Sequence, residues 1–125
     1  MPRIESDLLE LFQLCAKGEL SKANIKISEK TATTVILVSG GYPENYDKGM
    51  AVEGIPSKES SMVFHAGTAM QDGKLVTSGG RVFACTALEN TMKQALELSF
   101  FAANSINFDG KYFRIDIGKD LEKYC

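Results

Sequence analysis

Tryptophan is absent from this 125-residue sequence, and histidine, proline and cysteine are rare, with one, three and three residues respectively. The single histidine and the dispersed Cys15, Cys85 and Cys125 offer no CxxC or HxxxH spacing that would bring metal ligands together. The odd number and wide separation of the cysteines fit a reducing compartment better than a disulfide framework. We therefore expect no metal site in this chain, interpret the cysteines as core or incidental residues, and predict a cytoplasmic protein.

An excess of either charge is also lacking, since 14 basic side chains stand against 16 acidic ones for a net charge of -2. The two signs are interspersed, which excludes a polybasic stripe, so nucleic acid is not expected as a partner. The run Val35–Val38 is as long as any uninterrupted apolar stretch, far below the roughly 17–25 residues that cross a bilayer, and no signal-peptide pattern opens the chain. A membrane partner is therefore not expected, and the length fits a single domain over residues 1–125.

Two stretches show the 3.6-residue apolar period of a helix. The first, residues 6–18, has a serine and an aspartate available as N-cap and a glycine as its stop. The second follows a capping-box pattern at Thr86–Glu89 and continues to Ile106. Both helices are expected to pack on the core through apolar residues such as Leu11, Phe12, Met92 and Leu96.

The rest of the chain favours short strands, because apolar and β-branched residues alternate or cluster between glycine-rich turns. The loop Gly41–Ser61 has no sustained period, and a long loop in a compact domain is more often functional than idle. Since strands and helices do not alternate as βαβ units, we predict an α+β fold: a small, mainly antiparallel sheet or open barrel with two packed helices. The predicted strands are Ile25–Ile27, Thr33–Val38, Met62–His65, Lys74–Thr77, Arg81–Thr86 and Tyr112–Ile117, with turns at Ala66–Gly73 and Ser78–Gly80.

Residues with reactive side chains form no self-sufficient catalytic group. His65 ends a predicted strand, where a loop could present it to a ligand. A Cys–His nucleophile would need Cys15 or Cys85 beside it, and both cysteines fall on apolar faces. Acidic residues such as Asp47 and Asp116 are interpreted as solvated surface groups.

The segment Gly79-Gly80-Arg81 carries more specific chemistry. Adjacent glycines can turn successive backbone N–H groups into a concave anion site, and the Arg81 guanidinium adds a bidentate cation. The chain has eleven lysines and three arginines, which favours the idea that Arg81 serves through its planar fork. A tight hairpin whose arginine pairs with a surface acid explains the segment about equally well. Ser39–Pro43 also leaves a buried strand through glycines, and a tight exit turn is its simplest interpretation.

Six motifs stand in a specific order along the chain: Pro2–Leu8, Ser39–Pro43 with Tyr46–Gly49 behind it, Phe64–Thr68, Thr77–Val82, Thr86–Leu88 and Tyr112–Gly118. Together they resemble the C-terminal domain of the phosphoribosylamine–glycine ligase family, which belongs to the ATP-grasp ligases, and the resemblance covers essentially the whole chain. It implies a domain of the barrel-sandwich hybrid type. It also implies a part in purine biosynthesis, where the ligase joins phosphoribosylamine to glycine and cleaves ATP to ADP and phosphate.

The resemblance implies two sets of site residues. One set contacts the phosphoribosyl substrate, whose 5′-phosphate needs an anion site, and consists of Gly79, Gly80, Arg81, His65, Gly67 and Thr68. The other set is an active-site loop that faces the rest of the ligase, and consists of Ser39, Gly40, Gly41, Tyr42 and Pro43.

Members of this family carry further domains upstream, and the resemblance places the binding of ATP and of Mg²⁺ or Mn²⁺ there. It therefore implies that this chain holds no cofactor, cannot catalyse the ligation alone, and has the rest of the ligase on the same polypeptide as its partner. Phosphoribosylamine and glycine would be the substrates. Two alternatives stay open: a stand-alone, non-catalytic binding module for a phosphorylated small metabolite, and a cysteine hydrolase that uses His65.

Overall fold

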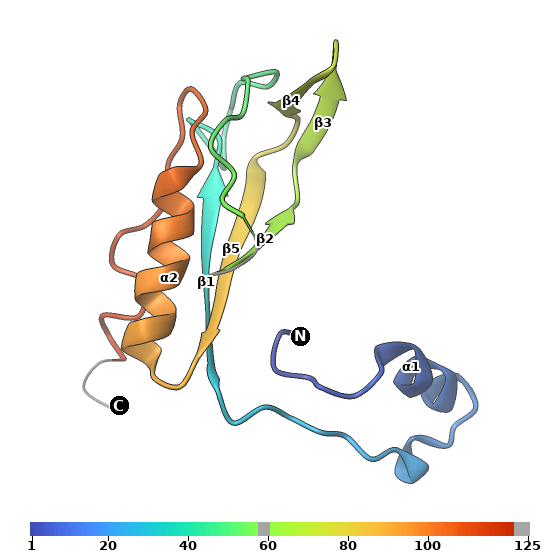
Figure 1. Cartoon of the computed structure of the whole chain (residues 1–125). Helices are drawn as coiled ribbons and strands as arrows, with labels where there is room; N and C mark the ends of the chain where they lie inside the picture. Colours follow the sequence, from blue (N-terminus) through green and yellow to red (C-terminus); the bar gives the residue numbers. More distant parts are fainter. Residues whose placement is uncertain (58–60, 122–125) are drawn as a thin grey trace.

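The computed structural model describes residues 1–57 and 61–121 and has an α+β fold, as predicted (Figure 1). In this part of the chain the strands form antiparallel sheets that do not close into a barrel. In chain order the elements are helix α1 (Leu8–Ala16), the 3-10 helix η1 (Leu20–Lys22), strands β1 (Thr31–Val38), β2 (Met62–His65), β3 (Thr68–Gln71), β4 (Lys74–Thr77) and β5 (Arg81–Glu89), and helix α2 (Met92–Ser105).

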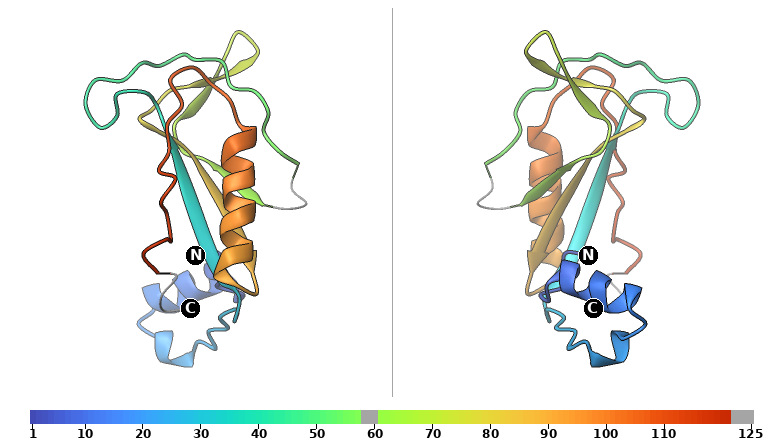
Figure 2. Two further views of the ribbon diagram at one scale, coloured as in Figure 1. Left: turned by 90° about the vertical axis from the view of Figure 1, so that its left-hand side faces the viewer. Right: turned by 90° about the vertical axis from the view of Figure 1, so that its right-hand side faces the viewer.

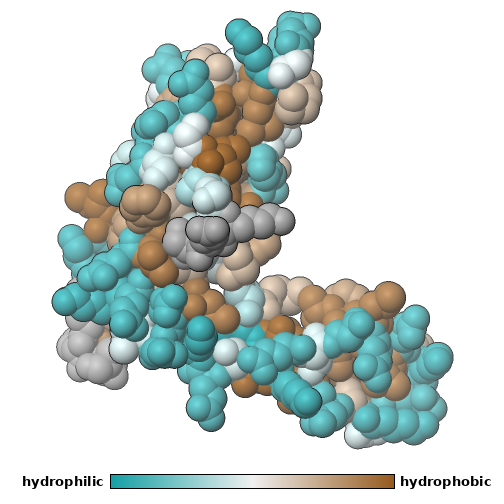
Figure 3. Space-filling view, viewed as in Figure 1, coloured by the Kyte–Doolittle hydropathy of each residue, from teal (hydrophilic) through white to brown (hydrophobic). Residues whose placement is uncertain are grey.

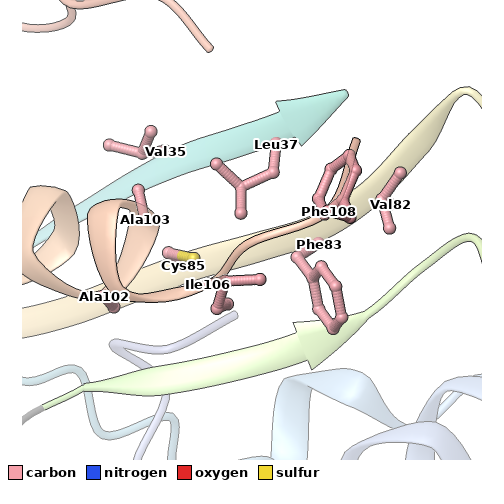
Figure 4. Packing of buried hydrophobic residues seen from close by; sticks show 9 residues of the cluster. All are labelled: Val35, Leu37, Val82, Phe83, Cys85, Ala102, Ala103, Ile106 and Phe108. Atoms are coloured by element: carbon pink, nitrogen blue, oxygen red, sulfur yellow. The ribbon is translucent and has the colours of Figure 1, made fainter. Parts of the chain in front are cut away.

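The main sheet has the order β1-β5-β2, and α2 lies across one of its faces (Figures 1 and 2). Val35 pairs with Cys85 and Leu37 with Phe83, so these four buried side chains share the face toward the helix. The helix meets them with small residues, which let its backbone approach the sheet closely. Figure 4 shows the resulting core, which also includes Val82, Ala102, Ala103, Ile106 and Phe108.

The pairing of β1 with β5 contains a β-bulge at its end. Leu37 pairs with Phe83, but Val38 pairs with Arg81, so Val82 is an extra residue on β5. Neighbouring side chains in a regular strand point to opposite faces, yet Val82 and Phe83 are both fully buried. The bulge therefore places Arg81 on the same side of the sheet as Val38.

Strands β3 and β4 form a separate hairpin at the end of the molecule opposite α1 (Figures 1 and 2). Its two-residue turn, Asp72-Gly73, has positive φ at both positions, which matches the twist of the flanking strands. The predicted turn Ala66–Gly73 is thus wrong over Thr68–Gln71, which form strand β3, and correct at Asp72-Gly73. The free edge of β4 is bridged by the long loop, where the N–H of Val52 donates to the carbonyl of Leu75.

Helix α2 begins at Met92, and the predicted capping box at Thr86–Glu89 is wrong because those residues belong to β5. Glu89 pairs with Thr31, so strand pairing outweighs the local helix signal. The same sequence pattern recurs at Thr91-Met92-Lys93-Gln94, and there it does cap the helix. The hydroxyl of Thr91 accepts a hydrogen bond from the Gln94 N–H at 3.3 Å.

Two predicted strands are single bridges only. Ile27 pairs with Ile4, and Tyr112 pairs with Val38, but neither pairing extends into a ladder. After Tyr112 the chain makes turns over residues 115–121 instead of continuing as a strand. The alternation of polar and apolar side chains from Tyr112 to Ile117 therefore arises in an irregular segment that lies beside β1, not in a strand.

Residues 1–30, which we call the arm, hold α1 away from the core (Figures 1 and 3). No residue of α1 is buried, and Phe12 is 62% exposed. The arm is closed on itself, since the Arg3 side chain donates to the Ser28 carbonyl at 3.0 and 2.8 Å. The prediction of two packed helices with Leu11 and Phe12 in the core is thus wrong for α1. Helix α2 does pack on the core, but through Ala95, Ser99, Ala102 and Ala103, whereas the predicted Met92 and Leu96 are only half-buried.

Candidate functional site

Gly67 and Gly79, two of the predicted site residues, lie backbone against backbone. The N–H groups of Ser78 and Gly79 both donate to the Gly67 carbonyl, at 2.8 and 3.2 Å. A Cβ atom on Gly67 would stand 2.5 Å from the Arg81 carbonyl oxygen and 2.8 Å from the Gly79 Cα, so only glycine fits between these two stretches of backbone. The contact ties the start of the β3–β4 hairpin to the connection that leads into β5.

The predicted active-site loop packs on the same connection. The Ser39 N–H donates to the Gly80 carbonyl at 2.8 Å, and the Ser39 hydroxyl donates to the Gly79 carbonyl at 2.9 Å. The Tyr42 ring covers Gly80 so closely that a Cβ there would be 2.1 Å from Tyr42 Cδ2. The structure therefore brings the loop and the glycine pair together.

Three other loop residues shape this arrangement. Gly40 lies against the backbone of Gly110, and Gly41 has a φ of +89°. The peptide bond between Tyr42 and Pro43 is cis. The Tyr42 N–H donates to the Ser39 carbonyl at 3.1 Å, so the chain turns here and the Tyr42 ring lies over Gly80.

The connection Ser78–Gly80 is not a hairpin turn, because β4 belongs to the small sheet and β5 to the main sheet. The N–H of Gly79 already donates to Gly67, so it is engaged within the protein. Arg81 is exposed, and within residues 1–57 and 61–121 it makes no ion pair. The alternative of a tight hairpin with a paired arginine is therefore not what this part of the chain forms.

Arg81 lines a pocket of about 340 Å³ on the side of the sheet away from α2. Thr34, Ile36 and Val38 of β1 form one wall, and Tyr42 of the loop stands near Arg81. The segment after α2 completes the lining with Tyr112, Phe113, Arg114 and Ile117. Sequence reasoning did not connect Arg114 and Tyr112 with Arg81, although the scarcity of arginine was a signal that pointed to both guanidinium groups.

His65 and Thr68 lie apart from this pocket. The Nδ1 atom of His65 is 2.9 Å from the hydroxyl of Thr68, and the His65 ring meets Phe83 edge-on at a centroid distance of 4.9 Å. Their neighbour Gly67 reaches Arg81 only through the backbone contacts described above. The predicted substrate-binding residues are therefore connected through backbone contacts at Gly67 and Gly79. Their side chains form two separate groups, with Arg81 in the pocket and His65 and Thr68 outside it.

The cysteines occupy different environments. Cys15 is exposed on the arm, while Cys85 is fully buried at the centre of the main sheet. Burial raises the pKa of the Cys85 thiol to about 11, and the positive charge of Lys111 opposes this rise only in part. Cys125 lies outside the described residues. Such a buried, protonated thiol is unsuited to nucleophilic catalysis.

Iodoacetamide is accordingly expected to label Cys15 and to leave Cys85 unmodified in the folded chain. Only about one Cys85 in a thousand would be ionised near pH 8, and the fully buried sulfur is inaccessible to the reagent. Peptide mapping by mass spectrometry after a short exposure measures this, with the denatured chain as the control in which Cys85 reacts. Fast modification of Cys85 in the folded chain would instead revive the cysteine hydrolase hypothesis.

In the part of the chain that the structure describes, no three His, Cys, Asp or Glu side chains gather as metal ligands. Over the same residues, no helix is long and apolar enough to cross a membrane.

The chain is similar to known proteins over nearly its full length. Residues 32–120 match the family model for the phosphoribosylglycinamide synthetase C domain. A phosphoribosylamine–glycine ligase from Vibrio cholerae is 42% identical over 120 residues, which cover 94% of this chain. The corresponding ligase from Caldanaerobacter subterraneus is 39% identical over 117 residues, with the same coverage of this chain.

A solved structure supports the same likeness. The crystal structure of phosphoribosylamine–glycine ligase from Thermotoga maritima superimposes with a TM-score of 0.70, at 32% identity, over 86% of this chain and 27% of that protein. This chain spans 28% of the length of the two bacterial relatives named above. In a bifunctional purine biosynthetic protein from Pichia angusta, 40% identical, it covers 15%.

Proposed function

Since this chain belongs to the phosphoribosylglycinamide synthetase C domain family, we propose that it serves as the C-terminal portion of a cytoplasmic phosphoribosylamine–glycine ligase. The reaction joins 5-phosphoribosylamine to glycine to give glycinamide ribonucleotide, with cleavage of ATP to ADP and phosphate. The observation that carries this proposal is the match of residues 32–120 to the family model, together with 94% coverage of this chain by ligases of that name.

ATP and Mg²⁺ or Mn²⁺ would be held by the rest of the ligase. Two observations support this assignment: among the described residues no three His, Cys, Asp or Glu side chains gather as metal ligands, and the segment Ser39–Pro43 lacks a phosphate-binding P-loop pattern. The chain's own contribution is to bind substrate and to close the active site.

Arg81 is the residue we propose for direct contact with the phosphoribosyl substrate. Its side chain is exposed and without an ion pair in the described part of the chain, and the β-bulge directs it toward the pocket beside Tyr42. Gly79 and Gly80 allow the backbone to pass close to Gly67 and the Tyr42 ring. His65 and Thr68 would line the neighbouring edge of the same active site.

The arm is the surface we propose for docking to the rest of the ligase. It lies entirely before the family model, which starts at residue 32. Large apolar side chains, including Leu9, Phe12, Ile25 and Ile27, are exposed on it (Figure 3). An isolated domain gains nothing from such exposure, so burial against a larger partner is the physical reason to expect a docked state.

A chimeric ligase tests the proposed function. The region of the Vibrio cholerae ligase that this chain matches is replaced by this chain, and glycine-dependent production of ADP is measured. The proposal predicts activity in the chimera and none in this chain by itself. A chimera that folds yet shows no glycine-dependent turnover, while this chain binds a sugar phosphate, would favour the stand-alone binding module.

Within an active chimera, Arg81→Ala should weaken binding of phosphoribosylamine by about 1.5–3 kcal/mol, because a charge-assisted hydrogen bond is lost. Arg81→Lys should restore part of the loss, since the charge remains but the fork does not. The apparent affinity from initial rates is the readout. An unchanged affinity in Arg81→Ala would show that the side chain is only a surface residue.

A further inference from the structure

The three arginines of this chain lie at two places, one in the arm and two at a single pocket. Arg3 donates from Nε and Nη2 to the Ser28 carbonyl, which closes the arm. The other two, Arg81 and Arg114, come from segments far apart in the sequence but line the same pocket. A chain that otherwise uses lysine for positive charge thus places both of its remaining guanidinium groups at one site.

Arg114 makes a two-point contact with Asp116. Its Nε donates to Asp116 Oδ1 at 2.9 Å and its Nη2 donates to Asp116 Oδ2 at 2.7 Å. These hydrogen bonds lower the pKa of Asp116, so the carboxylate is ionised at neutral pH. A guanidinium has five N–H groups, and the fork to Asp116 uses two of them, so three remain for a ligand. The contact with Asp116 thus orients the Arg114 guanidinium and leaves N–H donors available to a ligand.

The charge of the pocket is positive. Asp116 balances Arg114, whereas Arg81 makes no ion pair in the residues described. Apolar side chains, including Ile36 and Val38, form the wall beside these groups, and attraction between charges is stronger next to such a wall than in bulk water. A volume of about 340 Å³ lies within the range of small-ligand sites.

We propose that Arg81 and Arg114 jointly bind the phosphate group of a sugar phosphate in this pocket, with Asp116 as the positioning residue for Arg114. This inference rests on the proposed function, because it names the place where the phosphate of the phosphoribosyl substrate lies. A phosphate has enough acceptor oxygens for both guanidinium groups at once. The phenol groups of Tyr42 and Tyr112 line the same pocket and offer hydroxyl groups to the sugar.

Titration of the 125-residue chain with ribose 5-phosphate, followed by NMR, tests the site. We expect saturable shifts at Arg81, Arg114, Tyr42 and Tyr112, reversed by excess inorganic phosphate and absent with ribose alone. Saturable shifts confined to His65 and Thr68, or no saturable shifts at all, would overturn the proposal.

Two matched variants separate ligand binding from a structural role of the arginine–aspartate pair. Arg114→Gln should weaken ribose 5-phosphate binding on the order of 10-fold or more, because a charged contact is lost. Asp116→Asn should weaken binding less than Arg114→Gln does, because the amide oxygen still accepts one hydrogen bond from Arg114 while the guanidinium that contacts the phosphate remains. Arg3→Gln, a substitution in the arm, should leave the affinity for ribose 5-phosphate unchanged. Equal weakening by Arg114→Gln and Asp116→Asn would show that the pair only supports the fold, and would refute the proposal.

Activity measurements on the chimeric ligase distinguish failure of the proposed phosphate pocket from failure of the proposed function. An active chimera whose substrate affinity is insensitive to Arg114→Gln would refute the pocket and leave the proposed function standing. Ribose 5-phosphate binding that depends on Arg114, in a chain whose chimera is inactive, would support the pocket and refute the ligase assignment.

Discussion

Phe83→Ala is expected to lower the free energy of unfolding by about 3–5 kcal/mol, because it removes a fully buried aromatic ring and leaves a cavity. Phe83 sits on the central strand β5, opposite Leu37, and also meets the His65 ring at 4.9 Å. The ring therefore joins the sheet to the helix and lies beside one of the predicted site residues. Urea unfolding followed by circular dichroism measures the loss.

Phe101→Ala is the matched control for this prediction. Phe101 is on α2 but is 57% exposed, so its truncation should cost well under 1 kcal/mol. If the two variants unfolded at similar urea concentrations, the core would not lie between β5 and α2 as described. The slope of the free energy of unfolding against urea concentration should be the same for both variants, since neither substitution changes by much the surface that unfolding exposes.

Lys111→Met should destabilise the fold by about 2–4 kcal/mol, because the ammonium group caps the C-terminus of α2. Its Nζ donates to the carbonyls of Ala103 and Asn104 at 3.1 and 3.3 Å, and also to that of Ile106. Ala103 and Ile106 are fully buried, so their carbonyls would lose a partner that water replaces poorly. The same urea experiment gives the magnitude.

Lys93→Met controls for the loss of a lysine on the same helix. Lys93 lies in the first turn of α2, where a positive charge opposes the helix dipole, so its removal should be neutral or slightly stabilising. Equal destabilisation by both changes would mean that Lys111 acts only through its contribution to net charge. A loss confined to Lys111→Met would confirm that it acts as a cap. Because Lys111 precedes Tyr112 directly, it also anchors the segment that carries Arg114.

Three of the strands were predictable from the sequence. Met62–His65 and Lys74–Thr77 have the predicted bounds, and β1 begins two residues before the predicted Thr33. Each is a short apolar or β-branched run between turn residues, so its extended state follows from local chemistry alone. By contrast, Thr86–Glu89 fits both a helix cap and a strand, and only the pairing of Glu89 with Thr31 decides between them.

Burial was less predictable than extended structure. The amphipathic pattern of α1 is genuine, but a helix pattern says only that one face is apolar, not what covers it. The described residues cover that face only in part, since Leu8, Leu11 and Leu14 are half-buried and Phe12 is exposed. The weaker pattern of α2 is packed because its small residues, such as Ala102 and Ala103, fit against the sheet.

The amino-acid sequence by itself determined the α+β class, the glycine-rich segment before Arg81 and the family to which the chain belongs, because these depend on residue types and their order. Only the tertiary structure decided which side chains share a pocket. A β-bulge turns Arg81 toward β1, and the return of the chain after α2 brings Arg114 to the same place. Neither the bulge nor the path of the chain after α2 could be predicted from the local sequence, since both depend on contacts between segments distant in the sequence.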